Sequence, residues 1–367
     1  MKISALLSAP LLVAAAPATV RTGSDRLVAK DSVGVTSAEL ADMKIYSQWA
    51  GAANCNGQSA AGAAITCTGG VCPDVEATGA RIVDTFGLHP ISGVITDIHG
   101  FVATDDKNKL IVVSYKGSTS LRNYLADIVF YQVNCDDIVS GCTIHAGFAT
   151  ANNETWKKMT TALKAAVAAN PSYKIIFTGH SLGGATATVA AAKARNLGYA
   201  IDLFTYGSPR VGNEDFAQFV TNQPGRNYRV THLTDPVPRL PPIFLGFRHV
   251  SPEYWLQGGA ANTTDYGASD IKVCEGTAKI GCNAGSNGLE FDAHNYYLGP
   301  ITGCTGPFTF RRRDVAELAE LADLEGVPAM HVTPDMSTID SPAVTDEQLL
   351  ARMKMFAAQD IVVAQSL

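Results

Sequence analysis

The chain has 367 residues, with 28 Lys and Arg against 34 Asp and Glu, and a formal net charge of −6 at pH 7. An acidic chain without a basic stripe is a poor candidate for binding nucleic acid, and it has little electrostatic attraction to anionic membranes. With 46% hydrophobic residues, a chain of this length can bury an ample core.

The first 35 residues have the pattern of processing segments. Lys2 precedes an apolar run from Ile3 to Ala16, and small residues follow up to Ala18. This pattern predicts a cleaved signal peptide over residues 1–18, because the apolar run is too short to span a bilayer. The polar residues 19–35 are predicted to be a short propeptide or a disordered arm. No other segment is predicted to cross a membrane.

A first helix is predicted to begin at Thr36, because Thr36-Ser37-Ala38-Glu39 has the T-x-x-E spacing of a capping box. From there to Cys304, strand-like and helix-like segments alternate without a linker. That alternation predicts one α/β domain over residues 36–305, rather than the two domains that the length would allow.

Residues 110–115, with four apolar residues at their start, are predicted to form a strand that leads into Lys116-Gly117-Ser118. In the next segment, four apolar side chains recur at positions i, i+3, i+4 and i+7: Leu121, Tyr124, Leu125 and Ile128. Polar side chains, Asp127 among them, take the other side, so the segment is predicted to be a short amphipathic helix. An ordinary core helix is the alternative interpretation.

The most informative motif is Gly179-His180-Ser181-Leu182-Gly183. It lies between the apolar run 174–178 and the small-residue run 184–191, which together predict a strand, a sharp turn and a helix. In a G-x-S-x-G elbow the glycines allow strand and helix to approach closely, and the serine hydroxyl lies at the helix N-terminus. Ser181 is therefore a candidate nucleophile, and the N–H of Leu182 is a candidate donor to an oxyanion. The alternative is a chance match on an ordinary turn.

A serine nucleophile needs a base and a carboxylate, which follow a G-x-S-x-G serine along the chain in the order Asp or Glu, then His. Residues 227–233 are predicted to form a buried strand that stops before the prolines of Thr234-Asp235-Pro236-Val237-Pro238. Asp235 therefore lies at a strand end and is the candidate carboxylate. A turn-forming Asp before Pro is the alternative.

Four histidines follow Ser181 in the sequence. His232 precedes Asp235 within the predicted strand, and His331 lies in a tail unlike the rest of the chain. His249 and His294 both fit the expected order, and position favours His294, near the end of the core before an aromatic stretch. His145 and His180 are predicted to be structural.

Six segments together resemble the secreted filamentous-fungal lipases of class 3. They begin at Tyr115, Gly179, Tyr206, Asp235, Ser251 and Ala293, and they read YKGSTS, GHSLGGA, YGSPRVGN, DPVPRLPP, SPEYW and AH. They occur in the family order and cover about residues 35 to 305. The resemblance implies an α/β-hydrolase fold: a single domain with a central, mostly parallel sheet and a short amphipathic helical lid over the active site.

The resemblance also implies a function, a secreted serine lipase that hydrolyses acylglycerol esters through an acyl-enzyme. Ser181, Asp235 and His294 match the family triad. Ser118 matches the residue that gives its N–H and hydroxyl to the oxyanion, alongside the N–H of Leu182, and Asp127 matches the residue that orients that hydroxyl. The amphipathic segment Leu121, Tyr124, Leu125, Asp127 and Ile128 matches the lid. No cofactor and no metal is expected, and the chain is expected to act as a monomer on acylglycerols in droplets or emulsions.

Two other functions are compatible with this fold. A feruloyl-type or other carboxylesterase would carry a more polar segment that stays open, and Tyr124 with Leu121 and Leu125 argues against it. A catalytically silent lipid-binding protein is the other alternative, and the intact set of triad residues argues against it.

Eight cysteines fit an oxidising compartment. Local spacing suggests that Cys67 pairs with Cys72, Cys135 with Cys142 and Cys274 with Cys282. Cys55 and Cys304 remain, and the resemblance implies that they tie the N-terminal helix to the end of the core. A metal site is the competing interpretation, but paired C-x-x-C spacing is missing from the sequence.

Residues 306–367 are predicted to be a C-terminal extension. Arg311-Arg312-Arg313 precedes an acidic segment rich in Ala and Leu, and a basic cluster of this kind is a site for a processing protease. Removal of the tail from about Asp314 is the prediction, and a retained, partly helical surface tail is the alternative. Asn153 and Asn262 begin acceptor sequons for glycosylation.

Overall fold

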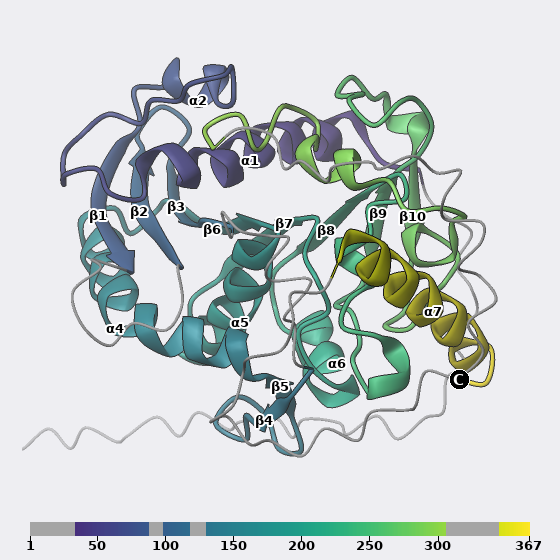
Figure 1. Cartoon of the computed structure of the whole chain (residues 1–367). Helices are drawn as coiled ribbons and strands as arrows, with labels where there is room; N and C mark the ends of the chain where they lie inside the picture. Colours follow the sequence, from purple (N-terminus) through teal and green to yellow (C-terminus); the bar gives the residue numbers. More distant parts are fainter. Residues whose placement is uncertain (1–33, 88–97, 118–129, 306–344) are drawn as a thin grey trace, which may run out of the picture. The chain divides into compact units, whose positions relative to one another are not determined.

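The computed structural model describes residues 34–87, 98–117, 130–305 and 345–367. Eight strands form one sheet in the order β1-β2-β3-β6-β7-β8-β9-β10 (Figure 1). The five central strands run parallel: β3 (Leu110–Tyr115), β6 (Lys174–His180), β7 (Ile201–Tyr206), β8 (Asn227–His232) and β9 (Glu253–Leu256). The other three strands join the sheet by antiparallel pairing: β1 (Arg81–Gly87) and β2 (His99–Asp105) on one side, and β10 (Ile271–Cys274) at the opposite edge. The sheet is therefore mostly parallel, as the family resemblance implies.

Helices cover both faces of this sheet (Figure 1). One face carries α1 (Ser37–Asn56), and the opposite face carries α4 (Ala146–Ala169) and α5 (Leu182–Asn196). The remaining elements are α2 (Pro73–Glu76), β4 (Gln132–Asn134), β5 (Thr143–His145), α6 (Glu214–Asn222), α7 (Asp346–Ala364) and the 3₁₀ turns η1 (Val237–Arg239), η2 (Ile243–Leu245), η3 (Ala268–Asp270), η4 (Asn283–Gly285) and η5 (Phe291–Asn295). None of the described helices combines the length and apolar content needed to cross a bilayer.

The two largest clusters of the core are apolar layers, one on each side of the sheet. On β3, Val112 belongs to the layer that includes Met43 and Trp49 of α1, whereas Ile111 and Val113 belong to the layer packed by α4 and α5. Successive side chains of a strand point to opposite faces, so both sides of a central parallel strand are buried and mostly apolar. This explains the apolar run over residues 110–113, whereas the buried hydroxyl of Ser114 is satisfied by donating to the carbonyl of Trp49 at 2.8 Å.

The predicted capping box is present at the start of α1. The Thr36 hydroxyl accepts from the N–H of Glu39 at 3.2 Å, and the Glu39 carboxylate accepts from the N–H of Thr36 at 2.9 Å. These bonds satisfy helix N–H groups that have no acceptor within the helix. The predicted start of the first helix is thus confirmed.

The four disulfides join Cys55 to Cys304, Cys67 to Cys72, Cys135 to Cys142 and Cys274 to Cys282. These are the pairs expected above. Three of them close short loops, and the first joins the end of α1 to the last part of the core across 249 residues.

The end of the expected C-terminal extension forms the helix α7. Its N-terminus has a second capping box, in which the Thr345 hydroxyl accepts from the N–H of Gln348 at 3.2 Å. The helix belongs to the same compact unit as the sheet, residues 34–367. The predicted signal peptide, Ser118, the predicted lid segment, Arg311-Arg312-Arg313 and His331 lie outside the described residues, so cleavage of the tail stays a prediction.

Candidate active site

Ser181 occupies the sharp turn between β6 and α5. Its backbone has φ 57° and ψ −128°, a conformation that L-residues rarely adopt. A Cβ at Gly179 would lie 2.4 Å from the carbonyl carbon of Gly183, and a Cβ at Gly183 would lie 2.2 Å from the carbonyl oxygen of Tyr115. Both glycines of the motif are therefore required by close backbone contacts, which is the physical reason for its spacing.

Backbone donors lie next to this serine. Leu182 is the first residue of α5, so its N–H is among the helix donors that lack an intrahelical acceptor. Gly117, at the end of β3, passes close by: a Cβ there would lie 2.9 Å from the carbonyl oxygen of His180 and 3.4 Å from Cβ of Ser181. The chain therefore reaches the elbow immediately before Ser118, which itself lies outside the described residues.

His294 and Asp235 form a buried pair beside the elbow. Nδ1 of His294 lies 2.7 Å from Oδ2 of Asp235, and the two side chains are 2% and 0% exposed. Asp235 follows β8, and His294 lies in η5, a 3₁₀ turn where the sequence indicates a loop. The ring of His180 lies 4.4 Å from the ring of His294, tilted by 39°, and its Nε2 binds the carbonyl oxygen of His294 at 2.9 Å. This contact connects the residue before Ser181 directly to His294.

The Asp235 carboxylate is held by three donors. Besides His294, the Tyr297 hydroxyl donates to Oδ2 and the N–H of Val237 donates to Oδ1 at 2.9 Å. A fully buried carboxylate needs such donors to offset the loss of its hydration. They fix its orientation, and Asp235 in turn keeps the proton of the His294 ring on Nδ1.

That tautomer leaves Nε2 of His294 as an acceptor. Nε2 of His294 and Oγ of Ser181 are both buried, and neither has a hydrogen-bond partner within the described ranges. A buried imidazole acceptor and a buried hydroxyl on adjacent segments are the two components of a proton transfer from serine to histidine.

Sequence reasoning missed two residues of this arrangement, Tyr297 and Gly207. Gly207 follows β7 with φ +58°, and a Cβ there would lie 2.9 Å from Cε1 of His294. A side chain at this position would displace the imidazole, so the glycine is needed for space as well as for backbone conformation. The only local signals were a glycine after a strand and an aromatic stretch after His294.

The other candidate histidines have different partners. His232 uses both ring nitrogens, Nδ1 on the carbonyl of Ala293 at 2.9 Å and Nε2 on the hydroxyl of Tyr266 at 2.7 Å. His249 binds the carbonyl of Pro238 through Nε2 at 2.6 Å. His145 caps α4 by accepting from the N–H of Gly147 at 3.1 Å. The structure thus pairs His294, and not His249, with Asp235.

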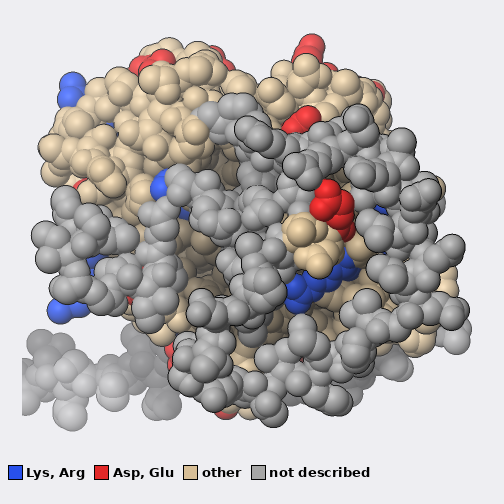
Figure 2. All heavy atoms as spheres, viewed as in Figure 1, with Lys and Arg blue, Asp and Glu red and all other residues tan. Residues whose placement is uncertain are grey.

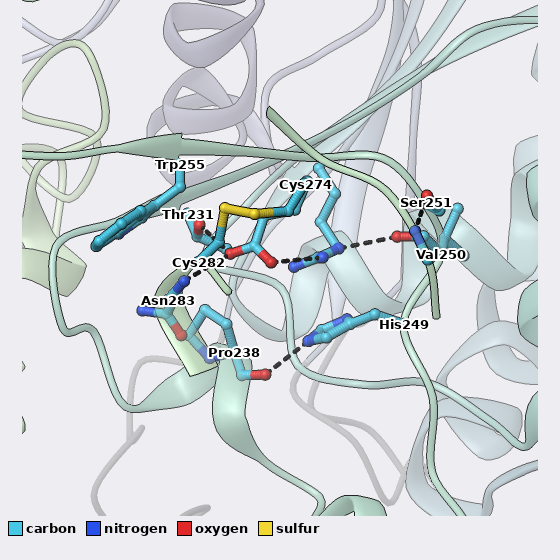
Figure 3. Close-up of polar contacts among 12 residues, drawn as sticks. Thr231, Pro238, His249, Val250, Ser251, Trp255, Cys274, Cys282 and Asn283 are labelled. Carbon is cyan, nitrogen blue, oxygen red and sulfur yellow. Dashed lines mark hydrogen bonds and ion pairs between the residues drawn. A yellow bond between two sulfur atoms is a disulfide. The ribbon is translucent and has the colours of Figure 1, made fainter. Parts of the chain in front are cut away.

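A buried polar network around the Glu253 carboxylate lies next to the Asp235 loop, and Figure 3 shows the part of it that includes Thr231 and Asn283. The Glu253 carboxylate accepts from Arg229 at 2.9 Å, from the Thr231 hydroxyl at 2.6 Å and from the N–H of Asn283 at 3.2 Å. The Asn283 side chain then donates to the carbonyl of Asp235 at 2.9 Å. Because Glu253 is paired with Arg229 and Asn283 joins it to the carbonyl of Asp235, the network can fix the backbone position of Asp235 without an unpaired buried carboxylate.

Burial lowers the pKa of three histidines, His180, His232 and His249, so that the folded state keeps them neutral. In the unfolded chain they bind protons below about pH 6.5, and the free energy of unfolding must therefore fall as pH drops through that value. We expect a loss of up to about 1.4 kcal/mol per pH unit for each of them. Urea unfolding between pH 7.5 and 5.5, above the range of ordinary carboxylates, measures this slope.

His249→Gln is the matched variant for that measurement, because a glutamine amide can still donate to the carbonyl of Pro238. The variant should unfold with a smaller pH slope. A slope equal to that of the wild-type chain, or stability independent of pH over this range, contradicts the prediction.

One set of metal-type ligands occurs among the described residues, the sulfurs of Cys55, Cys67 and Cys304. All three cysteines are already in disulfides, so they cannot supply thiolates to an ion. Lys and Arg are scattered over the described part of the face in Figure 2, without a basic stripe.

The chain is similar to known proteins over most of its length. The family model described as lipase (class 3) matches residues 112–245. The secreted mono- and diacylglycerol lipase 1 of Fusarium solani is 45% identical over 317 residues, which cover 86% of this chain and 93% of that protein. The secreted mono- and diacylglycerol lipase A of Penicillium camembertii is 38% identical and covers 74% of this chain and 89% of that protein.

Solved structures agree with this similarity. The crystal structure of the Aspergillus oryzae mono- and diacylglycerol lipase matches with a TM-score of 0.68 and 37% identity, covering 74% of this chain and 99% of that one. A fungal lipase structure described as having an unusual buried polar cluster matches with a TM-score of 0.69 and 38% identity, covering 74% of this chain and 100% of that one.

Proposed function

Since the chain belongs to the class 3 lipase family, we propose that it is a secreted lipase that hydrolyses acylglycerol esters at a lipid–water interface, with Ser181 as its nucleophile. The family membership, the α/β-hydrolase fold and the class of carboxylic ester hydrolase agree with the expectations from the sequence. The triad assignment is supported above all by one observation, the buried pair of His294 and Asp235 next to the Ser181 elbow.

In the proposed first step, Oγ of Ser181 gives its proton to Nε2 of His294 and attacks the carbonyl carbon of the ester. The ester oxygen of the glycerol then leaves, taking that proton from His294, and an acyl-enzyme forms on Ser181. A water molecule, deprotonated by His294 in the same way, hydrolyses the acyl-enzyme and releases the fatty acid. Asp235 keeps the imidazole in the required tautomer and stabilises its positive charge during each transfer.

The tetrahedral oxyanion needs donors that are already in position. We assign this role to the N–H of Leu182 and to the N–H and hydroxyl of Ser118. The Leu182 assignment is supported by its place at the N-terminus of α5. The Ser118 assignment is supported by the approach of Gly117 to His180 and Ser181, and Asp127 is assigned to orient the Ser118 hydroxyl.

The amphipathic segment that contains Leu121, Tyr124, Leu125 and Ile128 is proposed as the lid. Burying the four large side chains of such a helix face stabilises by several kcal/mol, at about 1.5–3 kcal/mol for each side chain. In water that face is favoured inward, over the site, and at a lipid surface it is favoured outward. Interfacial activity follows from this proposal.

We expect the hydrolysis rate to rise several-fold once a glyceride ester exceeds its solubility and forms droplets, because only droplets offer the lid a new apolar partner. The test compares dissolved and emulsified mono-, di- and triglycerides, a phospholipid and a feruloyl ester, with Ser181→Ala as the inactive control. Equal specific activity on dissolved and emulsified ester contradicts the lid. A preference for the feruloyl ester supports the esterase alternative, and correctly folded protein without any ester hydrolysis supports a silent lipid-binding protein.

A further inference from the structure

The C-terminal helix α7 has one buried face with a charged residue at its end. Leu349, Met353, Phe356 and Asp360 recur at positions i, i+4, i+7 and i+11 and therefore share one side of the helix. Leu349, Met353 and Asp360 are 1%, 3% and 3% exposed, whereas Met355 and Val362 are 40% and 69% exposed. The helix is thus docked on the protein by a defined face.

The surface beneath this face, which we call the rim surface, consists of Phe130, Val237, Leu240, Leu289 and Phe291. Val237 and Leu240 follow Asp235 by two and five residues, and Phe291 precedes His294 by three. The rim surface is therefore built from the segments that carry the proposed catalytic pair. In Figure 1, α7 lies against the segment that follows β8.

Aromatic contacts hold the middle of the helix. The Phe356 ring meets the Phe130 ring edge to face at 5.6 Å and lies 5.7 Å from the Phe244 ring. Phe130 is the first described residue after the proposed lid segment. Docking of α7 thus buries an aromatic side chain next to that segment, together with apolar side chains from the catalytic loops.

A buried ion pair fixes the register of the helix. Oδ2 of Asp360 lies 2.9 Å from Nη1 of Arg210, their side chains being 5% and 1% exposed, and Oδ1 accepts from the N–H of Phe244 at 3.2 Å. Arg210 also donates to the carbonyls of Arg239 and Pro241. A buried pair adds little net stability, but separating its partners inside the protein is costly. A shift of α7 by one turn would leave both charges buried and unpaired.

We propose that α7 is a built-in competitor of the lipid surface: it occupies the rim surface beside the catalytic loops and lowers the activity on aggregated lipid while it stays docked. This proposal rests on the proposed lipase function. The same apolar side chains cannot contact both α7 and a lipid droplet, so lipid adsorption and docking exclude each other. As part of the same chain, α7 competes at a high effective concentration, which cleavage at the predicted site Arg311-Arg312-Arg313 would remove.

The test uses the full chain and compares the same Met-to-Asp change at two positions of α7, in separate variants. Met353→Asp places a carboxylate in the docked face, and Met355→Asp places it on the exposed face. Asp360→Asn removes the charge opposite Arg210, and Met353→Ala is the milder replacement should Met353→Asp misfold. Hydrogen exchange of the amides of residues 346–364 reports whether the helix is released. Activity is measured on an emulsified diglyceride and on a dissolved short-chain ester.

Met353→Asp and Asp360→Asn should speed hydrogen exchange in α7 and raise the rate on the emulsion about tenfold, since each ~1.4 kcal/mol lost from docking increases the released fraction tenfold. Met355→Asp should change neither measurement. Faster hydrogen exchange in α7 without a higher hydrolysis rate on the emulsion overturns the proposal. Unchanged hydrogen exchange in Met353→Asp also overturns it, because the face that contains Met353 is then not docked. Wild-type protein inactive on both the emulsified and the dissolved ester would instead contradict the proposed lipase function, so the two failures are distinguishable.

Discussion

Replacing Ser181 by alanine is expected to lower kcat for ester hydrolysis by about 10⁶-fold, because the acyl-enzyme can no longer form. The residual rate over water would come from the oxyanion donors and from substrate binding alone. The rate is best measured on a dissolved short-chain ester, where lipid adsorption does not limit it. Activity within a hundredfold of the wild-type rate contradicts the assignment of Ser181 as nucleophile.

Ser181→Gly separates the chemical role of this residue from its backbone strain. Both variants lack the hydroxyl and should be equally inactive. Of these two residues, only glycine adopts the backbone conformation at φ 57° without strain. The free energy of unfolding of Ser181→Gly should therefore be about 1 kcal/mol higher than that of Ser181→Ala. Loss of activity accompanied by unfolding in both variants would instead show that Ser181 is needed for the fold.

The parts of the fold that could be predicted from sequence depend on short-range contacts. The elbow at Ser181 is defined by glycines two residues away on each side, and the capping box joins Thr36 to Glu39 across three residues. Steric and hydrogen-bonding requirements of this kind involve a few consecutive residues and can therefore be predicted from a short stretch of sequence. They therefore indicated the candidate nucleophile and the start of α1 without knowledge of the tertiary structure.

The choice of the base could not be made from spacing. His249 and His294 both follow Asp235, and both are buried polar side chains in the folded chain. What distinguishes them is the partner: His249 binds the carbonyl of Pro238, whereas His294 binds the carboxylate of Asp235. Only tertiary structure determines those partners, so the choice rested on position and on the family resemblance.

Contacts between distant segments account for what sequence reasoning missed. Tyr297 donates to a carboxylate 62 residues earlier, and Arg210 pairs with a carboxylate 150 residues later. The spacing of the apolar residues in α7 is helical, but whether that face is buried depends on a surface assembled from several loops. No local sequence pattern indicates such a surface. The sequence therefore predicts the tail only as a C-terminal extension and does not predict where α7 is docked.

Asp235→Asn is expected to lower kcat on the dissolved ester by about 10³–10⁴-fold with little change in KM, because it leaves the geometry nearly intact but reverses one hydrogen bond. With its oxygen toward His294 and Tyr297, the asparagine NH₂ faces the N–H of Val237, donor against donor. With its NH₂ toward His294, it forces the proton onto Nε2, which then cannot accept from Ser181.

Tyr297→Phe is the matched control for Asp235→Asn, since it removes one donor from the same carboxylate oxygen and leaves the bond from His294 in place. Its kcat should fall by only about tenfold, because the Asp235 carboxylate is held less firmly while His294 keeps its tautomer. Two losses of similar size would mean that the Asp235 carboxylate acts through the position of the loop and not through the imidazole. A loss below tenfold in Asp235→Asn would exclude the carboxylate from the catalytic mechanism, because each orientation of the asparagine carries a penalty that the carboxylate does not: a donor–donor contact with Val237 or the wrong tautomer of His294.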